Sequence, residues 1–385
     1  MSRILVVGAG LSGAVIAHQL AQAGLACLVV DERDHVAGQC HTSLDEETGI
    51  LVHRYGPHIF HTDKDEVWDF VSRFSEWAPY RHSVYSTVKG KVFNLPVNLL
   101  TINQFFGTAM GPAEAKEFIA SQAVPIAAPA NFHEQALSLV GEALYEAFFH
   151  HYTTKQWGTD DRHLPASILR RLPLRFSYDS NYFHHQRQAM PSDGYTAMVR
   201  HMLAHPLIEL RLGTASEQLD ETFDHTFYTG PLDRYFGYRL GRLGYRSLRF
   251  EELRLTGDAL GCPVMNFPDP EIPWTRMTEH KHLSPWRKTG SDATIVWKEF
   301  SEATAPGKTP YYPLRLAGDE RLLKEYVGLA HGEHGVTFLG RLGCYAYIDM
   351  DAAIERALET ARTAISAVGE HRPPPVFVHD PLSKA

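Results

Sequence analysis

The chain has 385 residues, of which 44% are apolar and 21% are charged, and its formal net charge is −8. This length exceeds the size at which one hydrophobic core usually splits, so we expect two or three domains. The composition is typical of a globular protein and excludes a disordered or fibrous chain. The acidic balance argues against a general nucleic-acid surface, which needs a basic face.

The start of the chain predicts a strand, a helix and a second strand. Residues 3–7 form a short apolar run before a glycine, as in a buried parallel strand. Residues 11–23 have helical character, Gly24 is placed to end that helix, and residues 26–30 resemble a second buried strand ending at Asp31. The apolar run superficially resembles a signal peptide, but glycines interrupt it. We therefore expect a folded βαβ unit, and no stretch of the sequence approaches the ~20 apolar residues of a membrane span.

A glycine fingerprint lies between the first strand and the helix. Gly8, Gly10 and Gly13 match the pattern G-x-G-x-x-G, and Asp31 follows at the distance of an acid that binds a ribose. The first glycine makes a tight turn, the second lets the backbone approach a pyrophosphate, and the third permits contact between helix and strand. The helix N-terminus offers N–H groups to phosphates. The alternative, a glycine-rich turn without a ligand, fits the surrounding strand, helix and acid less well.

The remainder of the chain changes character twice. Residues 66–151 carry amphipathic helical patterns, apart from a strand-like hairpin over residues 84–93. After residue 195 the pattern is mixed, with strands at 208–212 and 223–228, and a last helix covers about 350–368. Four widely spaced cysteines indicate buried, reduced thiols rather than disulfides or zinc ligands: Cys27, Cys40, Cys262 and Cys344.

The sequence contains one dinucleotide fingerprint, so one site must hold the working cofactor. The segment after Asp31, with Arg33 and Gly38, resembles the extended fingerprint of FAD proteins of the amine-oxidase and glutathione-reductase type. Residues 340–343 resemble the late glycine-containing segment that those proteins contribute to the flavin. We therefore predict FAD. Without a nicotinamide domain, such an enzyme either oxidises its substrate directly or is reduced without a tight NAD(P)H site.

Six blocks, in the same order over nearly the whole chain, resemble the UDP-galactopyranose mutase family. Besides the fingerprint they are GPHIFHT at 56–62, YTTKQWG at 152–158, LPASI at 164–168 with Arg171, WTRMTEHK at 274–281, and residues 341–351. Two differences concern local flavin contacts rather than the reaction. The family often has Gly-Gly-Asn where this chain has Ala37, Gly38 and Gln39, and an arginine where Ala346 stands.

This resemblance implies an α/β fold with three parts. The parts are a discontinuous Rossmann-like FAD-binding domain (1–65, 195–235 and 330–385), a helical insertion domain (66–165) with a mobile lid at about 165–177, and a β-rich substrate domain (178–194 and 236–329).

The resemblance also implies a reaction, the interconversion of UDP-galactopyranose and UDP-galactofuranose without net redox change. The family works with reduced FAD, whose N5 attacks the anomeric carbon, so that UDP leaves and a flavin–sugar adduct forms. The adduct opens to an iminium ion and recloses through another hydroxyl before UDP returns. The sequence lacks a G-x-S-x-G elbow, an H-E-x-x-H motif and a Walker A loop, which is consistent with chemistry carried by a cofactor.

Two arginines match the family's phosphate ligands. Arg171, in the lid segment, and Arg276 would hold the diphosphate, because guanidinium forks suit phosphate oxygens. By position alone each would be a solvated surface arginine, and aromatic residues would usually be core. The resemblance adds a uracil platform at Phe148 and Tyr152, and the other predicted substrate contacts are Thr153, Trp157, Tyr182, Asn266, Tyr312, Tyr347 and Asp349.

The family's histidine loop would lie against the flavin ring near N5, and His61 could act as an acid or base. The H-x-x-H spacing of His58 and His61 invites a zinc site, but no further ligands present themselves, so no metal is expected. Asp349 is either an acid near the flavin or substrate or a helix N-terminal acid. Other histidine pairs, including 150–151, are taken as structural or solvated. The predicted cofactor-binding residues are Gly8, Gly10, Ser12, Gly13, Asp31, Glu32, Gly38, Gln39, Pro57, His58, His61, Arg341 and Asp349.

Two other functions stay open. An FAD-dependent oxidoreductase of the amine-oxidase type shares the fold, but it would need an apolar substrate cavity instead of arginines and tyrosines. A flavin- or UDP-binding regulatory module would bind without conversion. The resemblance further implies a cytoplasmic homodimer that acts on UDP-galactose in cell-wall or polysaccharide biosynthesis.

Overall fold

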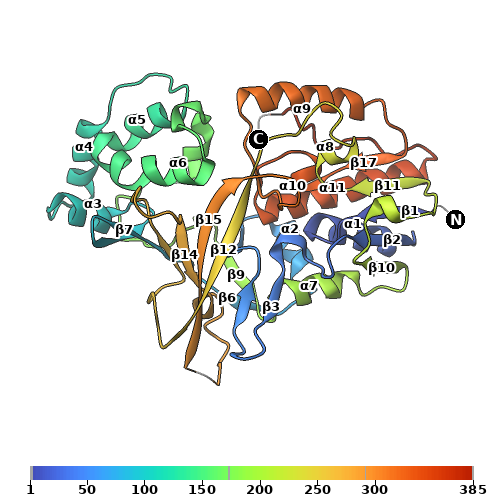
Figure 1. Ribbon diagram of the computed structural model, residues 1–385, viewed down its shortest axis with the longest axis horizontal. Helices are drawn as coiled ribbons and strands as arrows, with labels where there is room; N and C mark the ends of the chain where they lie inside the picture. Colours follow the sequence, from blue (N-terminus) through green and yellow to red (C-terminus); the bar gives the residue numbers. More distant parts are fainter. Residues whose placement is uncertain (1–2, 172–173, 291, 384–385) are drawn as a thin grey trace.

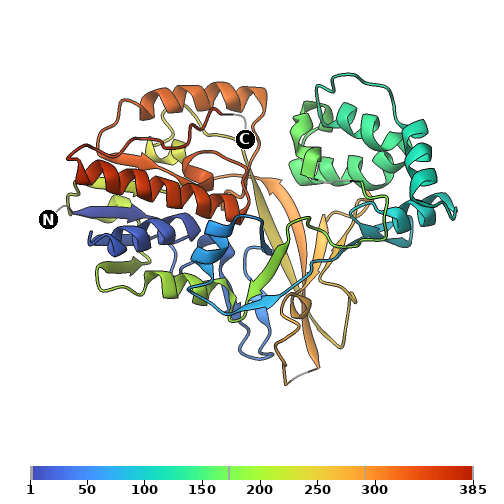
Figure 2. The same ribbon diagram turned by 180° about the vertical axis from the view of Figure 1, so that it is seen from behind.

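A computed structural model describes residues 3–171, 174–290 and 292–383. Figure 1 shows a helical region at one end, a parallel sheet covered by helices at the other, and a long antiparallel sheet between them. Figure 2 shows the same arrangement from behind, with the last helix lying across the parallel sheet. None of the helices among the described residues combines the length and apolarity that a membrane crossing requires.

Five parallel strands form the sheet that begins the chain, in the order β10-β2-β1-β11-β17. Apolar residues fill its two central strands, which is why both are buried: Val6 and Val29 face each other across the pair and are fully buried. The predicted strands at 3–7, 26–30 and 208–212 are confirmed. The strand bounds are β1 Ile4–Val7, β2 Cys27–Asp31, β10 Ile208–Leu212, β11 His225–Tyr228 and β17 Val336–Phe338.

Helices cover this sheet, and the first of them packs closely because its residues are small. Helix α1 (Leu11–Gln22) buries Ala14, Ile16 and Ala17 completely and lies against α11 (Met350–Gly369) and α7 (Gly194–Leu203). The start of α1 therefore points its free N–H groups at the carboxyl ends of β1 and β2, the usual place for a dinucleotide. The other helices outside the helical region are α2 Asp65–Val71, α8 Leu232–Tyr235, α9 Ala317–Ala330 and α10 Gly340–Gly343.

The larger sheet has the order β16-β12-β15-β14-β13-β7-β8. The predicted hairpin at 84–93 is confirmed, and it joins this sheet because β7 pairs in parallel with β13. The register places Arg276 of β14 opposite Asn266 of β13 on one side and opposite Glu299 of β15 on the other. The strand bounds are β7 Val84–Val88, β8 Lys91–Leu95, β12 Tyr245–Thr256, β13 Val264–Asn266, β14 Arg276–Glu279, β15 Ala293–Ala303 and β16 Tyr312–Pro313.

Two small sheets connect the larger ones. One pairs β3 with β4, and the other has the order β5-β9-β6 and carries His61 on β5. The position of β5 between α11 and β9 holds that histidine at the boundary of the parallel sheet. The strand bounds are β3 Thr42–Leu44, β4 Leu51–His53, β5 Phe60–Thr62, β6 Trp77–Pro79 and β9 Arg187–Pro191.

The helical region has its own apolar core, and its helices begin where the sequence offers caps. The side chain of Asn98 accepts the N–H of Thr101, and that of Asn131 accepts the N–H of Glu134 at 2.9 Å. The region departs from a regular helical pattern at Tyr145–His150, which forms a π-helical turn between α5 and α6. The helix bounds are α3 Leu99–Phe106, α4 Pro112–Gln122, α5 Phe132–Leu144 and α6 His151–Trp157.

Candidate functional site

A cavity of about 1280 Å³ opens between the parallel sheet and the antiparallel sheet. Its lining runs from the glycine turn at Gly8 and the acid Asp31 to Arg276 of β14 and Tyr152 of α6. Pockets for drug-sized ligands are about 300–1,000 Å³, so this cavity has room for a dinucleotide and a second ligand. The two ends of the cavity differ in chemistry.

The glycine turn leaves no room for a side chain at Gly8 or Gly13. A Cβ atom at Gly8, whose φ is +103°, would lie 2.1 Å from Oγ1 of Thr229. At Gly13 a Cβ would lie 1.8 Å from the carbonyl oxygen of Gly8, so this glycine permits the contact of helix with strand and does not itself line the cavity. Gly10 and Ser12 do line it, at the start of α1. The turn therefore fits a bound pyrophosphate as the fingerprint predicts.

Asp31 is held in place by the backbone around it. One carboxylate oxygen accepts the N–H of Ala9 at 2.9 Å, and the other accepts the N–H of Arg33 at 3.0 Å. Each oxygen keeps a lone pair, so the carboxylate can still accept hydrogen bonds from a ribose. Glu32 also lines the cavity and pairs with Arg234 at 2.8 Å.

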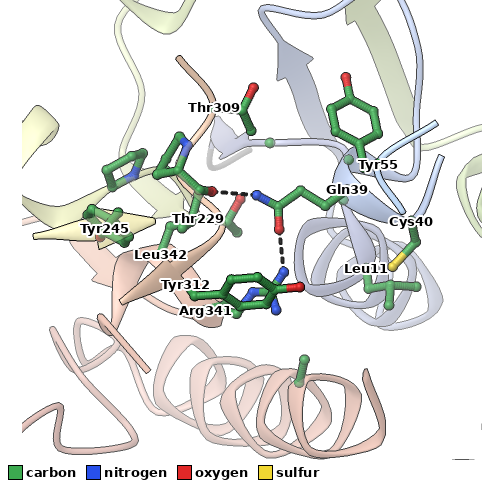
Figure 3. Close-up of a pocket in the computed structure, with 18 of the residues that line it drawn as sticks. Leu11, Gln39, Cys40, Tyr55, Thr229, Tyr245, Thr309, Tyr312, Arg341 and Leu342 are labelled. Carbon is green, nitrogen blue, oxygen red and sulfur yellow. Dashed lines mark hydrogen bonds between the residues drawn. The ribbon is translucent and has the colours of Figure 1, made fainter. Parts of the chain in front are cut away.

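Gln39 connects three segments of the cavity wall, as Figure 3 shows. Its amide nitrogen donates to the carbonyl oxygen of Pro310 at 2.5 Å, and its amide oxygen accepts from Arg341. The residue two positions before it, Ala37, has a left-handed backbone with a φ of 74°. Left-handed backbone costs a residue with a side chain about 1–2 kcal/mol, so the chain tolerates strain at Ala37.

His58 is a neutral imidazole at the same wall. Desolvation by the surrounding protein, followed by the charge of Arg341, lowers the pKa of His58 to about 4. Its Nδ1 lies 2.9 Å from the carbonyl oxygen of Gly56, which can only accept, so Nδ1 carries the proton and Nε2 is an acceptor. Pro57 lies beside it in the lining.

His61 reaches the cavity from β5 and has a second histidine behind it. Its Nδ1 lies 3.0 Å from Nδ1 of His185, and its ring stacks on Phe183 with centroids 3.8 Å apart. One of the two Nδ1 atoms must donate to the other, so the tautomers of the two rings are linked. His61 thus lines the cavity with a ring whose tautomer depends on that of His185.

Arg276 presents its guanidinium to the opposite end of the cavity. Its Nε donates to Oε2 of Glu299 at 2.8 Å, and Glu299 is buried. Burial is the largest single influence and lowers the pKa of Arg276, but Glu299, Tyr152 and Tyr312 together raise that pKa further above its usual range. Because Nε is engaged, Nη1 and Nη2 remain to bind an anion in the cavity.

Tyrosine hydroxyls surround this guanidinium. Tyr152, Tyr182, Tyr312 and Tyr347 all line the cavity, together with Asn266 and Asp349. Burial raises the pKa of Tyr312 to about 12 and raises those of Tyr152 and Tyr182 as well. These three phenols therefore stay protonated at neutral pH and can donate hydrogen bonds to phosphate oxygens.

Three predicted substrate residues lie behind the lining. Phe148 packs edge-on against Phe93, with ring centroids 5.3 Å apart, and Thr153 is buried. Trp157 packs behind Tyr347 at 5.7 Å. In this arrangement the three residues support the cavity wall.

The lid arginine is only partly described. The backbone of Arg171 ends a short 3₁₀ turn, Ala166–Arg171, whereas its side chain lies outside the described part of the chain. Residues 172–173 of the predicted lid lie outside it as well.

No sequence pattern predicts the role of Lys155, although the residue lies within a matched block. Its ammonium group donates to backbone carbonyl oxygens of the loop before β14, among them those of Asp269 and Ile272, each at 2.9 Å. The other two acceptors are the carbonyls of Phe267 and Trp274. Lys155 thus connects α6 to the strand that carries Arg276. Neither this role nor that of Glu299 has a local pattern, because both depend on pairing between distant segments.

Comparison with known proteins identifies the region around this cavity. Residues 147–347 match the family model described as UDP-galactopyranose mutase, and residues 6–74 match that of an NAD(P)-binding Rossmann-like domain. The first of these includes Arg276 and the tyrosines that line the cavity.

Relatives match over almost the full chain. A probable UDP-galactopyranose mutase of Klebsiella pneumoniae is 47% identical, covering 97% of both chains. A dTDP-fucopyranose mutase of Escherichia coli is 43% identical, covering 95% of this chain and 99% of its own. Among solved structures, that of a reduced UDP-galactopyranose mutase superposes with a TM-score of 0.75 at 16% identity, covering 96% of both chains, which supports the fold.

Proposed function

This chain belongs to the UDP-galactopyranose mutase family, and from that premise we propose that it interconverts UDP-galactopyranose and UDP-galactofuranose with reduced FAD. The observation that carries the proposal is Arg276, which Glu299 holds at the cavity end opposite the glycine turn. A cationic fork among protonated phenols suits a diphosphate leaving group. An amine oxidase would need an apolar cavity at this position.

The chain's own residues fit FAD at the other end of the cavity. Gly8 and Gly10 leave space for the pyrophosphate, Asp31 and Glu32 lie where the adenosine ribose would be, and Arg341 with Gln39 lies farther along. When bound and reduced, FAD would supply the nucleophilic nitrogen that holds the sugar while UDP is detached. The protein would supply position, charge and exclusion of water.

The diphosphate would be held by Arg276 and by the hydroxyls of Tyr152, Tyr182, Tyr312 and Tyr347. Negative charge accumulates on the leaving phosphate as the glycosidic bond breaks, so these donors stabilise the transition state more than the ground state. Arg171 would add a second guanidinium from the lid. Tyr152 and Asn266 would contact the uracil, and the buried residues Phe148, Thr153 and Trp157 would support the cavity wall.

The cavity wall that contains His58 and His61 would carry out proton transfer during ring opening. His58 is neutral with Nε2 as an acceptor, so it would orient the reacting groups by accepting a hydrogen bond. His61 has His185 behind it and could exchange a proton with that ring. Asp349 lines the same wall and would contact the substrate or the flavin side chain.

A second candidate substrate is dTDP-fucopyranose, because a relative 43% identical over 95% of this chain carries that name. Both substrates combine a pyrimidine nucleoside diphosphate with a pyranose, so Arg276 and the tyrosines would serve either. The higher identity to the Klebsiella relative favours the galactose substrate.

We further propose that the protein is a cytoplasmic homodimer.

The proposal is tested by incubating dithionite-reduced, FAD-loaded protein with UDP-galactofuranose and separating the pyranose isomer by chromatography. Conversion should be fast with the UDP-sugar and slower with dTDP-fucofuranose, and Arg276→Ala should remove most of it while FAD stays bound. If flavin-loaded, reduced protein converts neither sugar, the proposal is refuted. Faster conversion of the dTDP-sugar would replace it by the second candidate.

A further inference from the structure

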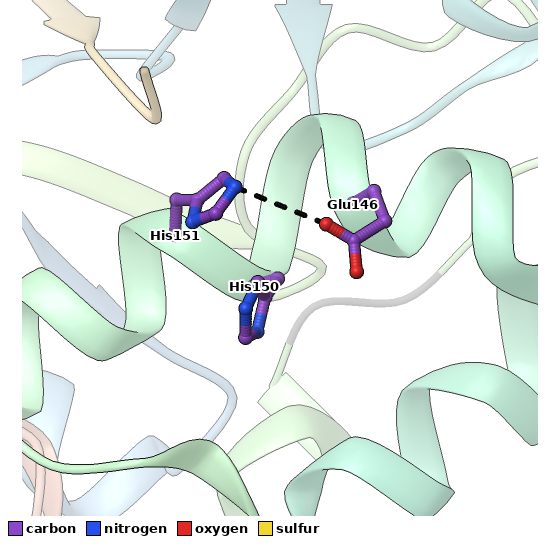
Figure 4. Close-up of side chains that lie close together, drawn as sticks. All are labelled: Glu146, His150 and His151. Carbon is purple, nitrogen blue, oxygen red and sulfur yellow. Dashed lines mark ion pairs between the residues drawn. The ribbon is translucent and has the colours of Figure 1, made fainter. Parts of the chain in front are cut away.

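The helical region carries a group of metal-ligating side chains outside the cavity, on and just after the π-helical turn. Glu146, His150 and His151 each offer one ligand atom, and these atoms lie within 4.8 Å of one another. Figure 4 shows the three side chains gathered on the same stretch of helix. Oε2 of Glu146 and Nε2 of His151 are 3.8 Å apart, and the site is open to solvent.

The π-helical turn brings these residues together. In a regular α-helix, residues five apart point about 140° away from each other around the axis, since each residue advances by about 100°. A π turn closes between residues i and i+5, so Glu146 and His151 come onto one face. Glu146 and His150, four apart, share a face in either helix. The departure from α-helical geometry therefore builds the site, and π turns often occur where a protein binds something.

A buried carboxylate lies behind His150. Oδ2 of Asp161 is 3.1 Å from Nδ1 of His150 and 2.6 Å from the hydroxyl of Tyr145. Asp161 is 1% exposed, and its other oxygen has no hydrogen-bond partner among the described residues. A carboxylate on one ring nitrogen fixes the tautomer of a metal-binding histidine and makes the other nitrogen a better ligand. Asp161 thus leaves Nε2 of His150 to act as the ligand.

We propose that Glu146, His150 and His151 bind a divalent transition-metal ion of the zinc class. Two imidazoles and one carboxylate are ligands that such ions accept, and water would complete the coordination. Side-chain rotations of the exposed Glu146 and His151 would bring their atoms from 3.8 Å to the separation that a shared ion imposes. The ion would stabilise the π turn, and its ligand His151 directly precedes Tyr152, which lines the cavity.

A second group of potential ligands in the described chain serves as a contrast. Asp258, Glu279 and His282 also gather, but Lys281 already lies 3.3 Å from Glu279 and supplies the positive charge. Glu279 in addition accepts the N–H of Leu260 at 2.7 Å and the hydroxyl of Thr294. This carboxylate is satisfied without an ion, so His282→Ala is a matched control.

The test is calorimetric titration of tag-free, chelator-treated full-length protein with zinc chloride, and in parallel with cobalt(II) chloride to read the visible absorption of the bound ion. We expect one equivalent per chain, with affinity weakened at least about tenfold by His151→Ala and by Glu146→Gln. Both positions are partly exposed, so folding should be intact, which circular dichroism checks. Asp161→Asn should weaken binding without removing a ligand.

His282→Ala should leave the titration unchanged. The proposal is overturned if the protein binds no zinc up to about 100 µM. It is equally overturned if one equivalent binds as tightly to His151→Ala as to the unaltered protein, or if His282→Ala removes it.

Discussion

At the scale of single residues, the pairing of Arg276 with Glu299 shows how a buried charge is prepared for an anion. The guanidinium is held beside a buried carboxylate through Nε, which leaves its other two nitrogens to bind an anion in the cavity that Arg276 lines. Arginine also offers two parallel donors to a phosphate, whereas lysine offers a point charge.

Replacing Arg276 with lysine should therefore raise KM for the nucleotide sugar and lower kcat, although the positive charge is kept. Loss of one charge-assisted hydrogen bond is worth about 1.5–3 kcal/mol, or roughly 10- to 150-fold in kcat/KM. Steady-state kinetics on the reduced enzyme measures this. Arg249→Lys is the control, because Arg249 lies over Phe300 on an exposed stretch of β12 and should change nothing. If KM and kcat of Arg276→Lys were the same as those of Arg249→Lys, the role of Arg276 would be contradicted.

Functional residues in or near a motif could be predicted from the sequence. Residues that act by contacting a distant segment of the chain could not. A matched block predicts Arg276, the family resemblance predicts Tyr182 and Tyr312, and all three line one cavity in the structure. Glu299 follows Arg276 by 23 positions and meets it through the β14–β15 register. Such a register depends on the whole sheet, so no local pattern reveals it.

At the scale of elements, the start of α1 depends on how closely its helix approaches β1. Gly13→Ala should prevent this approach, because its Cβ would lie 1.8 Å from the carbonyl oxygen of Gly8. Overpacking of this kind costs about 1–3 kcal/mol, and we expect less bound FAD after purification, measured by flavin absorbance per chain. Gly328→Ala, within α9 and with open space at its Cβ, should keep full flavin content. Full flavin in Gly13→Ala would show that the turn does not set the cofactor site.

The link between α6 and the loop before β14 rests on one ammonium group. Lys155→Met keeps the length of the side chain but removes the donors to the four carbonyl oxygens. We expect a loss of about 1.5–3 kcal/mol in unfolding free energy and faster proteolysis within the loop. Lys91→Met, at an exposed position of β8, is the control. Unchanged stability of Lys155→Met in urea unfolding would contradict this role.

Whether a segment is a strand or a helix could be predicted from the sequence where the apolar pattern was clear, as for the strand at 208–212 and the last helix at 350–368. The π-helical turn Tyr145–His150 did not, since the sequence pattern there fits an ordinary helix. The turn follows a break at Gly141, whose φ is +74°, and depends on how the flanking helices pack. The sequence indicates structural or solvated histidines at 150–151, whereas the structure gathers them with Glu146.

At the scale of the whole molecule, the structure buries neutral histidines at the boundaries between its sheets. Burial lowers the pKa of His82 to about 3 and that of His280 to about 3, and it lowers that of His53 well below the usual value. The unfolded chain binds protons at these rings as pH falls through about 6.5, and the folded chain does not. These rings therefore contribute fully to the unfolding free energy above about pH 6.5, and that contribution is lost as pH falls below this value.

We predict that unfolding free energy decreases by up to about 2 kcal/mol for each buried histidine between pH 7 and pH 5. Urea unfolding at both pH values measures the decrease, in a range where most carboxylates stay ionised. His82→Phe keeps a ring but cannot titrate. Between pH 7 and pH 5 the unfolding free energy of this variant should therefore decrease less than that of the unaltered protein, by up to about 2 kcal/mol. Equal stability at pH 7 and pH 5 would contradict the assignment of neutral, buried rings.

The parallel sheet and the larger sheet bring the glycine turn and Arg276 into one cavity. The central claim of our proposal is that catalysis there leaves the flavin as it began. The direct measurement is the flavin spectrum of anaerobic, reduced protein during turnover of UDP-galactofuranose. We predict that UDP-galactopyranose accumulates to many equivalents per flavin while the spectrum stays that of reduced flavin, and that oxidised protein makes none. Product limited to one equivalent, with the flavin oxidised in step, would contradict the claim.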